Sequence, residues 1–375
     1  MIVAGEASGD RHAAHLVDAL RERVADLEVF GSGGDEMAAR GADLLVHARD
    51  VAIIGVPEVV RGFRRLLNAF NTLRTAAVER RPDAVILVDW PEFNLRLATK
   101  LHAAGLRVIY YISPQVWAWR EGRVDRIRRD VERMLVIFPF EEAFYARHGV
   151  DAEFVGNPLA GEVAPRGSRE SFCAAHGLDP ARELLAVLPG SRRKEIAYNL
   201  PVIVGAIELL RVERPGLQFV LPLASTVDRA QVAAIVEPVA ESVALVEGDT
   251  YSAVGHADFA VVASGTATLE TALLGTPLVV IYRVSGLNYA LHKPLIKIDT
   301  FGMVNLIAGK RIAPELIQKD CTPERIAAEV LAYLEHPDRL ATMRSELAEI
   351  RAKLDFAGGA SRRAADAVLR ILAAD

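Results

Sequence analysis

The amino-acid sequence predicts an α/β protein that consists of two doubly wound parallel sheets. Short, continuous apolar runs alternate with helical segments, which is the pattern of strands buried on both faces of a parallel sheet. The alternation restarts after Gly161–Ser168, a linker-like stretch that contains Pro165 and Gly167. With 375 residues, the chain is long enough for two domains of ordinary size.

The bulk composition excludes several classes of protein. Apolar residues make up 51% and charged residues 25%, as in ordinary globular proteins. The net charge of −5 argues against bulk nucleic-acid binding. Cys173 and Cys321 lie far apart and outside any Cys/His cluster, which suits a reducing cytoplasm and argues against a zinc site or a disulfide framework. No D-x-D pair is present, so we expect no D-x-D site for a divalent metal. We also expect no cofactor.

No segment of the sequence is expected to cross a membrane. The apolar runs are all shorter than the roughly 20 residues that span a bilayer. The first residues, Met1–Gly5, are typical of a strand and not of a signal peptide. We therefore expect an intracellular protein whose membrane contact is peripheral.

The first strand leads into a tight turn and a helix. Gly5 and Ser8 keep the turn small, so that backbone N–H groups can face a ligand. The turn lacks G-x-G-x-x-G, and Glu6 and Asp10 are unusual in a phosphate-binding loop. We interpret this turn as facing a sugar or another hydroxyl-bearing acceptor; the alternative is an ordinary connection between strand and helix. A second strand and a glycine turn follow at Val29–Gly34.

The segment Val51–Arg74 is basic and amphipathic. A broad apolar face with arginines beside it can lie in a membrane interface and meet anionic headgroups. The alternative is a helix packed on the core with solvated arginines. The apolar, loop-like run Ala52–Pro57 favours contact with lipid or a partner. The candidate membrane-contacting residues of this segment are Ile53, Ile54, Val56, Val59, Phe63, Arg61, Arg64 and Arg65.

Asp89 is the candidate general base. It follows the apolar run Ala84–Val88, and Pro91 stops the strand directly after it. The carboxyl ends of parallel strands face the ligand crevice of an open α/β sheet, and Asn94 lies beside Asp89 in sequence. The alternative is that Asp89 only caps the next helix, with Glu92 as its capping-box partner.

The rest of the first half continues the alternation. We expect a helix at Leu95–Ala104 and strands at Val108–Ile112 and Met134–Phe138. Trp117 and Trp119 lie just past the end of one strand, where they can line an acyl or sugar pocket or act as a packing wedge.

Two turns in the second half are typical of a nucleotide site. Ser191 and Arg192 lie between a strand and a helix, where arginine can bind a diphosphate through two hydrogen bonds. Ser264–Thr266, with Gly265 at its centre, opens a helix at another strand end and so forms an anion site. Glu270, about one turn into that helix, can accept hydrogen bonds from a ribose. The strands expected in this half are Leu184–Leu188, Leu217–Leu221, Val243–Val246, Phe259–Ala263 and Leu278–Tyr282.

Seven short motifs together resemble those of the lipid-A-disaccharide synthase family, in the same order along the chain. They are GEASGD at Gly5–Asp10, D-x-P-x-F-N at Asp89–Asn94, SPQVWAWR at Ser113–Arg120, PFE at Pro139–Glu141, LPGSR at Leu188–Arg192, SGTATLE at Ser264–Glu270 and VNLIAG at Val304–Gly309. Each motif is weak alone, but together they cover almost the whole chain. Two positions depart from the family: Asn157 stands where a histidine is common, and Trp90 is bulky and is expected to narrow the acyl pocket.

The resemblance implies a GT-B fold, in which two Rossmann-like doubly wound domains face a central cleft. We expect an N-terminal acceptor and membrane-docking domain at 1–163, a UDP-sugar domain at 164–345, and a helical segment at 346–375 that crosses back to the first domain. The implied reaction is an inverting glycosyl transfer from UDP-2,3-diacylglucosamine to 2,3-diacylglucosamine 1-phosphate. It gives UDP and a β-1,6-linked tetraacyl disaccharide 1-phosphate for lipid A biosynthesis in Gram-negative bacteria.

The resemblance also implies roles for single residues. Asp89 would deprotonate the acceptor 6-hydroxyl, Arg192 would hold the diphosphate and Glu270 the ribose. Asn305 and Gln318 would lie near the nucleotide-sugar. The family works at the inner face of the inner membrane and forms homodimers.

Three other functions remain open at this stage. A UDP-GlcNAc epimerase would not need the basic amphipathic face of Val51–Arg74, and a peptidoglycan GlcNAc transferase would open with a G-G-T-G-G-H turn, which Gly5–Asp10 is not. A non-catalytic lipid-binding protein would have no use for both Arg192 and Glu270 around a nucleotide.

Overall fold

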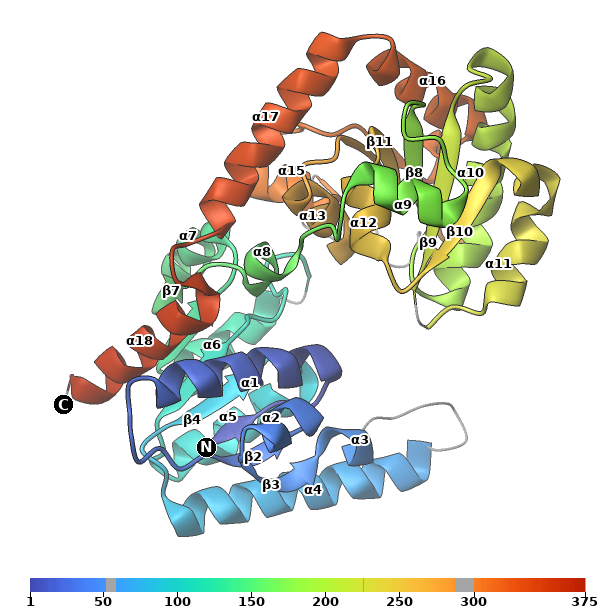
Figure 1. Ribbon diagram of the computed structural model, residues 1–375. Helices are drawn as coiled ribbons and strands as arrows, with labels where there is room; N and C mark the ends of the chain where they lie inside the picture. The colour runs from blue at the N-terminus through green and yellow to red at the C-terminus, as the bar shows by residue number, and fades with distance from the viewer. Residues whose placement is uncertain (52–58, 120, 225, 287–299, 375) are drawn as a thin grey trace. The chain divides into compact units, whose positions relative to one another are not determined.

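The computed structural model describes residues 1–51, 59–119, 121–224, 226–286 and 300–374, with only the backbone described for 59–63. The chain forms two compact units (Figure 1). Unit 1 consists of Met1–Pro158 and Leu354–Asp375, and unit 2 consists of Leu159–Lys353. The sequence placed these limits after residues 163 and 345. Part of the predicted linker is helical, because α8 occupies Pro158–Glu162.

Unit 1 is built on one parallel sheet with the strand order β3-β2-β1-β4-β5-β6-β7. The order runs outward in both directions from β1 and β4, which makes their shared edge the topological switch point. The strands are β1 (Ile2–Val3), β2 (Phe30–Gly33), β3 (Asp43–His47), β4 (Val85–Val88), β5 (Val108–Tyr111), β6 (Arg133–Val136) and β7 (Ala152–Phe154).

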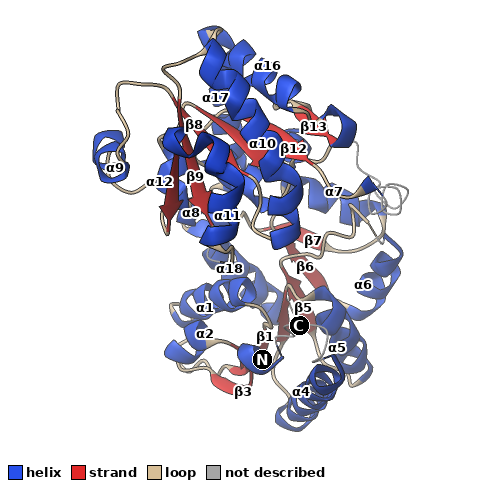
Figure 2. Ribbon diagram, turned by 90° about the vertical axis from the view of Figure 1, so that its right-hand side faces the viewer, coloured by secondary structure: helices blue, strands red, loops and turns tan. Residues whose placement is uncertain are grey.

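Helices cover the sheet of unit 1 (Figure 2). The last helix, α18, packs beside α1, and its residues Ala364, Ala365 and Val368 join the core formed by β1, β4 and α1 (Figure 1). The helices are α1 (Ala7–Arg21), α2 (Asp35–Ala39), α3 (Ala48–Val51), α4 (Val59–Arg80), α5 (Pro91–Ala103), η1 (Glu121–Arg123), α6 (Val124–Asp130), α7 (Pro139–Arg147) and α18 (Gly359–Ala373).

The helix after Asp89 begins earlier than expected. The sequence placed its start at Leu95, whereas α5 begins at Pro91. Proline suits the first helical position, because the N–H that it lacks would have no partner there. The short strands β3, β7 and β13 (Glu315–Ile317) were not predicted.

Unit 2 repeats the arrangement with the strand order β10-β9-β8-β11-β12-β13. Its switch point lies between β8 and β11, and all the pairs described are parallel. The strands are β8 (Leu184–Leu188), β9 (Gln218–Leu223), β10 (Val243–Glu247), β11 (Phe259–Ala263), β12 (Leu278–Tyr282) and β13 (Glu315–Ile317). The predicted fold class of two doubly wound α/β sheets is confirmed.

The helices of unit 2 also cover both sides of its sheet (Figure 2). They are α8, α9 (Arg169–His176), α10 (Arg193–Glu213), α11 (Arg229–Val236), η2 (Glu237–Ser242), α12 (Thr250–Gly255), α13 (Thr266–Leu273), α15 (Met303–Ala308), η4 (Gln318–Asp320), α16 (Pro323–Leu334) and α17 (Pro337–Leu354). Among the described residues, no helix has the length and apolar character that crossing a membrane requires.

Candidate active site

The candidate base of unit 1 lies at the switch point of its sheet. Asp89 directly follows β4, and the turn that begins at Gly5 follows β1, the neighbouring strand. Asp89 and Trp90 both have left-handed backbone conformations, with φ of 47° and 49°. The Tyr110 hydroxyl donates to the Asp89 carbonyl oxygen over 2.5 Å, and Asn94 Nδ2 lies 2.8 Å from the same oxygen.

The Asp89 carboxyl has the electrostatic character of a base that works near neutral pH. Burial, followed by the negative charge of Glu6, raises its pKa to about 6, while the backbone N–H of Trp90 lowers it. The residue that caps α5 is Trp90, whose own side chain makes no capping hydrogen bond, so Asp89 lies one residue before the cap position. The capping alternative for Asp89 is therefore not realised in the structure.

Asn94 points into the sheet. Its side chain is fully buried, and Nδ2 lies within hydrogen-bonding distance of the carbonyl oxygens of Val3 (3.4 Å) and Val88 (3.2 Å) as well as Asp89. This geometry corrects the expectation that Asn94 faces an acceptor, because its amide joins β1, β4 and the residue after β4.

Gly5 leaves room for an aromatic ring. A Cβ atom at Gly5 would lie 2.2 Å from the Trp90 indole, so only glycine fits this backbone position. The indole stacks on Phe93 with ring centroids 3.9 Å apart. The Trp90 ring therefore lies against the Gly5 turn on one part and against Phe93 on another.

The polar residues of the Gly5–Asp10 turn divide into two groups. Glu6 and Ser8 are exposed. The Asp10 side chain is buried and accepts hydrogen bonds from the backbone N–H groups of Gly34 (2.6 Å), Glu36 (3.0 Å) and Met37 (3.2 Å). Asp10 therefore caps the start of α2, which corrects the expectation that it faces a sugar.

The two tryptophans have different surroundings. Trp117 is only 8% exposed, and its Nε1 donates to Glu141 Oε1 over 3.0 Å. Glu141 Oε2 accepts from the N–H groups of Ile137 and Phe138, and burial raises the pKa of this carboxyl to about 7. Trp117 is therefore a packing residue and not a lining residue, whereas Trp119 is 41% exposed.

The predicted membrane segment is only partly described. Ile53, Ile54 and Val56 lie outside the described residues. The backbone of Val59, Arg61 and Phe63 belongs to α4, and nothing is described of their side chains. The Arg64 and Arg65 side chains are exposed on the same helix.

In unit 2, the turn after β8 is held by Glu195. Glu195 Oε2 accepts from the backbone N–H groups of Ser191 (3.0 Å) and Arg192 (3.2 Å), and Oε1 accepts from the Arg192 guanidinium over 2.8 Å. The Arg192 side chain is 82% exposed. At Gly190, φ is 118°, and a Cβ atom would lie 2.6 Å from Glu195 Oε2. In this turn the Glu195 carboxylate binds the backbone N–H groups, and the Arg192 guanidinium is exposed to solvent.

The turn after β11 opens α13. Gly265 precedes the first helical residue with φ of 146°, and Thr266 is exposed at the helix start. The Ser264 hydroxyl donates to the Phe301 carbonyl oxygen over 2.6 Å. Glu270 Oε1 accepts from the Tyr251 hydroxyl over 3.2 Å, and burial raises the Glu270 pKa. Ser191–Arg192 and Ser264–Thr266 follow adjacent strands, so both turns lie at the switch point of unit 2.

Asn305 and Gln318 are engaged with the backbone. The Asn305 amide is buried, donates to Ala313 O and Glu315 Oε1, and accepts from the N–H groups of Ile312 and Ala313. Its hydrogen bonds fix the loop before β13, which corrects the expectation that it contacts a ligand. Gln318 is half-buried with φ of 52°, and its Oε1 accepts from the N–H of Val284.

Three residues of these clusters were missed or left without a role at the sequence level. Tyr110 and Tyr251 each make one hydrogen bond, to Asp89 and to Glu270, and Glu195 makes two to Arg192. Glu195 carries a usable signal, since it follows the turn by three residues as a capping-box acid does. Tyr110 and Tyr251 lie far from their partners in sequence.

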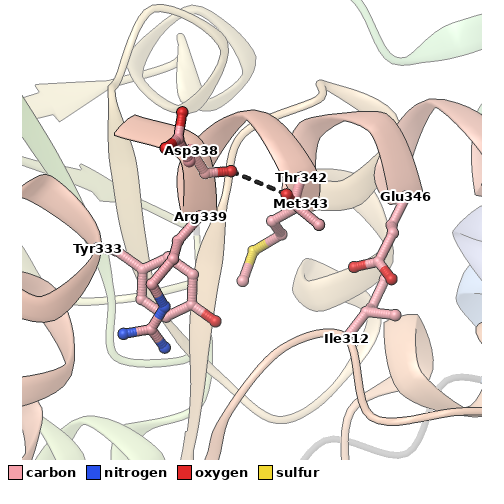
Figure 3. A pocket seen from close by; sticks show the side chains of 7 residues that line it. All are labelled: Ile312, Tyr333, Asp338, Arg339, Thr342, Met343 and Glu346. Atoms are coloured by element: carbon pink, nitrogen blue, oxygen red, sulfur yellow. Dashed lines mark hydrogen bonds between the residues drawn. The ribbon is translucent and has the colours of Figure 1, made fainter. Parts of the chain in front are cut away.

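A pocket of about 240 Å³ lies elsewhere in unit 2 (Figure 3). Met343 Sδ lies 3.2 Å from the N–H of Leu278, the first residue of β12, so the pocket is at the amino edge of the sheet and away from Arg192. Figure 3 shows the Arg339 guanidinium over the Tyr333 ring, 4.3 Å from its centroid. The lining residues are Ile312, Tyr333, Asp338, Arg339, Thr342, Met343 and Glu346.

Among the described residues, no group of three or more His, Cys, Asp or Glu side chains is arranged to hold a metal ion.

Comparison with known proteins gives one consistent family. The family model of lipid-A-disaccharide synthetase matches residues 1–369. The lipid-A-disaccharide synthase of Myxococcus xanthus is 48% identical over 372 residues, which is 99% of this chain and 97% of that protein. The lipid-A-disaccharide synthase of Geobacter metallireducens is 46% identical with the same coverage.

Solved structures share the two-domain fold at low identity. A UDP-GlcNAc 2-epimerase from Neisseria meningitidis, bound to UDP-GlcNAc, superimposes with a TM-score of 0.66 at 12% identity, covering 100% of this chain and 99% of that one. The glycotransferase of kitacinnamycin gives a TM-score of 0.59 at 20% identity, covering 98% and 97%. These likenesses agree with the expected GT-B fold.

Proposed function

This chain belongs to the lipid-A-disaccharide synthase family, and on that premise we propose that it joins UDP-2,3-diacylglucosamine to 2,3-diacylglucosamine 1-phosphate. Membership makes it a glycosyltransferase with UDP-sugar and lipid substrates. The specific substrates and the roles of single residues are the proposal. The observation that carries it is the placement of Asp89 at the switch point of unit 1, with a carboxyl pKa of about 6.

The reaction starts at the acceptor. Asp89 takes the proton of the acceptor 6-hydroxyl, and the oxygen attacks C1 of the UDP-linked sugar. The bond between C1 and the diphosphate oxygen breaks with inversion at C1, and UDP leaves with the electron pair. Glu6 and Ser8, which are exposed next to the Gly5 turn, contact acceptor hydroxyls.

Unit 2 binds the nucleotide. The guanidinium of Arg192, the hydroxyl of the exposed Ser191 and the N–H groups of Gly265 and Thr266 at the start of α13 stabilise the charge on the leaving diphosphate. Glu270 accepts hydrogen bonds from the ribose. Gln318 lies at the carboxyl end of β13, on the same edge of the sheet, and contacts the nucleotide-sugar.

The acyl chains are proposed to stay in the membrane while the sugars react. Arg64 and Arg65 on α4 would meet anionic headgroups at the inner face of the inner membrane, and the exposed Trp119 would contact an acyl chain. Sedimentation of the chain with anionic vesicles, compared with neutral ones, tests this part. The homodimer stays a prediction that light scattering can check.

The decisive experiment compares the Asp89→Asn and Asp83→Asn variants. Asp83 is exposed just before β4, so its variant controls for a lost carboxylate near the same strand. We expect Asp89→Asn to bind UDP normally and to turn over at least ~100-fold more slowly, the lower range of general-base catalysis. Near-normal turnover would remove Asp89 as the base.

The substrates are tested by acceptor-dependent release of UDP in detergent micelles. UDP release together with a disaccharide product supports both substrates. UDP binding without turnover would point to a different acceptor, and an absence of UDP binding would overturn the role of unit 2. The epimerase alternative is not favoured, because the likeness to epimerases is at 12% identity and concerns the fold alone.

A further inference from the structure

The backbone at Asp89 is strained twice in succession. Asp89 and Trp90 both have φ near 50°, and among the described residues other than glycine they are the one adjacent pair with positive φ. A left-handed conformation costs a non-glycine residue about 1–2 kcal/mol. Such strain persists only where the surroundings hold it, and it is common at functional sites.

Two side-chain donors converge on the strained residue. Tyr110 lies on β5, the neighbour of β4, and its hydroxyl is 2.5 Å from the Asp89 carbonyl oxygen. Asn94 lies on α5, and its Nδ2 is 2.8 Å from the same oxygen. Both side chains are fully buried, so water does not compete for these hydrogen bonds. The backbone N–H of Asp89 donates to Tyr111 O over 3.0 Å and fixes the other side of the residue.

The two donors satisfy both lone pairs of the Asp89 carbonyl oxygen. A carbonyl oxygen has two lone pairs, and a buried carbonyl without partners is costly. Burial raises the pKa of Tyr110 well above its ordinary value, so its hydroxyl stays protonated and donates. With its N–H held by Tyr111 O and its carbonyl oxygen held by the two donors, Asp89 has both φ and ψ constrained, and these angles set the direction of its Cβ and carboxylate.

We propose that Tyr110 and Asn94 are positioning residues that hold Asp89 in its left-handed conformation and so aim its carboxylate at the acceptor hydroxyl. The inference rests on the proposed function of Asp89 as the base. Neither side chain touches the substrate. Their contribution is to keep the base within the narrow geometry that proton transfer requires.

The experiment removes the Tyr110 hydroxyl in the unmodified protein and in the Asp89→Asn variant, which lacks the base. Tyr110→Phe is made alone and in the Asp89→Asn background. Tyr145→Phe is the matched control, because Tyr145 is equally buried in unit 1 and its hydroxyl bonds to Ser113 over 2.7 Å, not to Asp89. Steady-state kcat and KM are measured for each variant, with UDP affinity and urea unfolding.

We expect Tyr110→Phe to lower kcat about 10- to 100-fold, the scale of a small misplacement of a catalytic group, with unchanged KM for the UDP-sugar. In the Asp89→Asn background the same change has no further effect, because the base that it positions is absent. Tyr145→Phe stays within about twofold in both backgrounds. Asn94→Leu, which removes the second donor and keeps the branched four-atom side chain, gives the same pattern and provides a second test if Tyr110→Phe does not fold.

The outcomes distinguish the positioning role of Tyr110 from the role of Asp89 as the base. Equal losses from Tyr110→Phe in both backgrounds would overturn the positioning role and leave a structural one. Normal kcat for Tyr110→Phe beside an inactive Asp89→Asn would also overturn it while the proposed function stands. Near-normal turnover of Asp89→Asn would instead remove the base itself.

Discussion

The indole of Trp90 lies nearly parallel to the ring of Phe93, with an interplanar angle of 9°. The stacked indole occupies the space where a side chain at Gly5 would begin. Two motifs that are distant in sequence, the first turn and the residues after β4, are therefore fitted to each other by the absence of one Cβ atom.

Replacing Gly5 with alanine should destabilise unit 1. The new Cβ would lie 2.2 Å from the indole, so the ring or the backbone must move, and overpacking of this kind costs about 1–3 kcal/mol. Urea unfolding measures the loss, and the same Gly5→Ala change should cost much less in a Trp90→Ala background, where the ring is absent. Gly122→Ala is the control, because a Cβ there meets nothing within 4 Å. Equal stability of the two alanine variants would contradict the prediction.

The rate should fall on the acid side of about pH 6. The base works only when it is ionised, and the pKa of Asp89 is about 6, so kcat/KM drops about tenfold per pH unit below that value. Glu6→Gln removes a negative charge that raises this pKa, so the acid limb should move to lower pH. A limb that stays in place in Glu6→Gln would exclude the coupling between the two carboxyls.

The stability of the chain should depend on the proton of Glu141. Its pKa is about 7 in the folded state, against an ordinary value of 4.5, so between these values the folded state binds more protons than the unfolded state. The free energy of unfolding therefore falls as pH rises from about 4.5 to about 7, by up to the order of 3 kcal/mol.

Glu141→Gln tests this prediction, because glutamine has no proton to lose. Its unfolding free energy, measured in urea at a series of pH values, should lack most of the decline. Glu142→Gln changes the exposed neighbour and should keep the slope of the unmodified protein. The same slope in all three proteins would show that Glu141 titrates normally.

Removing Glu195 should weaken UDP binding. Its carboxylate holds two N–H groups of the turn and the Arg192 guanidinium, and without it the turn and the cation lose their fixed geometry. We expect the Kd for UDP to rise about tenfold in Glu195→Ala, equivalent to about 1.4 kcal/mol. Glu213→Ala, at the exposed far end of α10, should leave the Kd unchanged. Calorimetric titration distinguishes the two variants, and equal affinities would show that Glu195 has no part in the site.

The buried strands were predictable because a continuous apolar run within each segment is enough to identify it. Leu184–Leu188 and Phe259–Ala263 were predicted with the bounds that β8 and β11 have in the structure. The edge strands β3, β7 and β13 were missed, because they are short and partly exposed, and their pairing depends on the neighbouring strand and not on an apolar run.

The residues of the candidate site likewise fall into those that the sequence predicts and those that depend on how the strands pair. Asp89 and Arg192 were accessible from the sequence, because a polar residue at the end of an apolar run must lie at the sheet edge. Tyr110 was not accessible, because its hydroxyl meets Asp89 only after β4 and β5 pair. The inward direction of Asn94 likewise depends on β1 and β4 being neighbours.

The packing of α18 against α1 has a consequence for biosynthesis. Unit 1 takes its core from residues at both ends of the chain, with the whole of unit 2 between them. A ribosome therefore completes unit 2 before it makes the helix that unit 1 needs. We expect the nascent chain to fold unit 2 first and to leave the apolar face of α1 uncovered until α18 has been made. Contacts between residues this far apart in sequence close slowly, so the last step of folding should be the docking of α18.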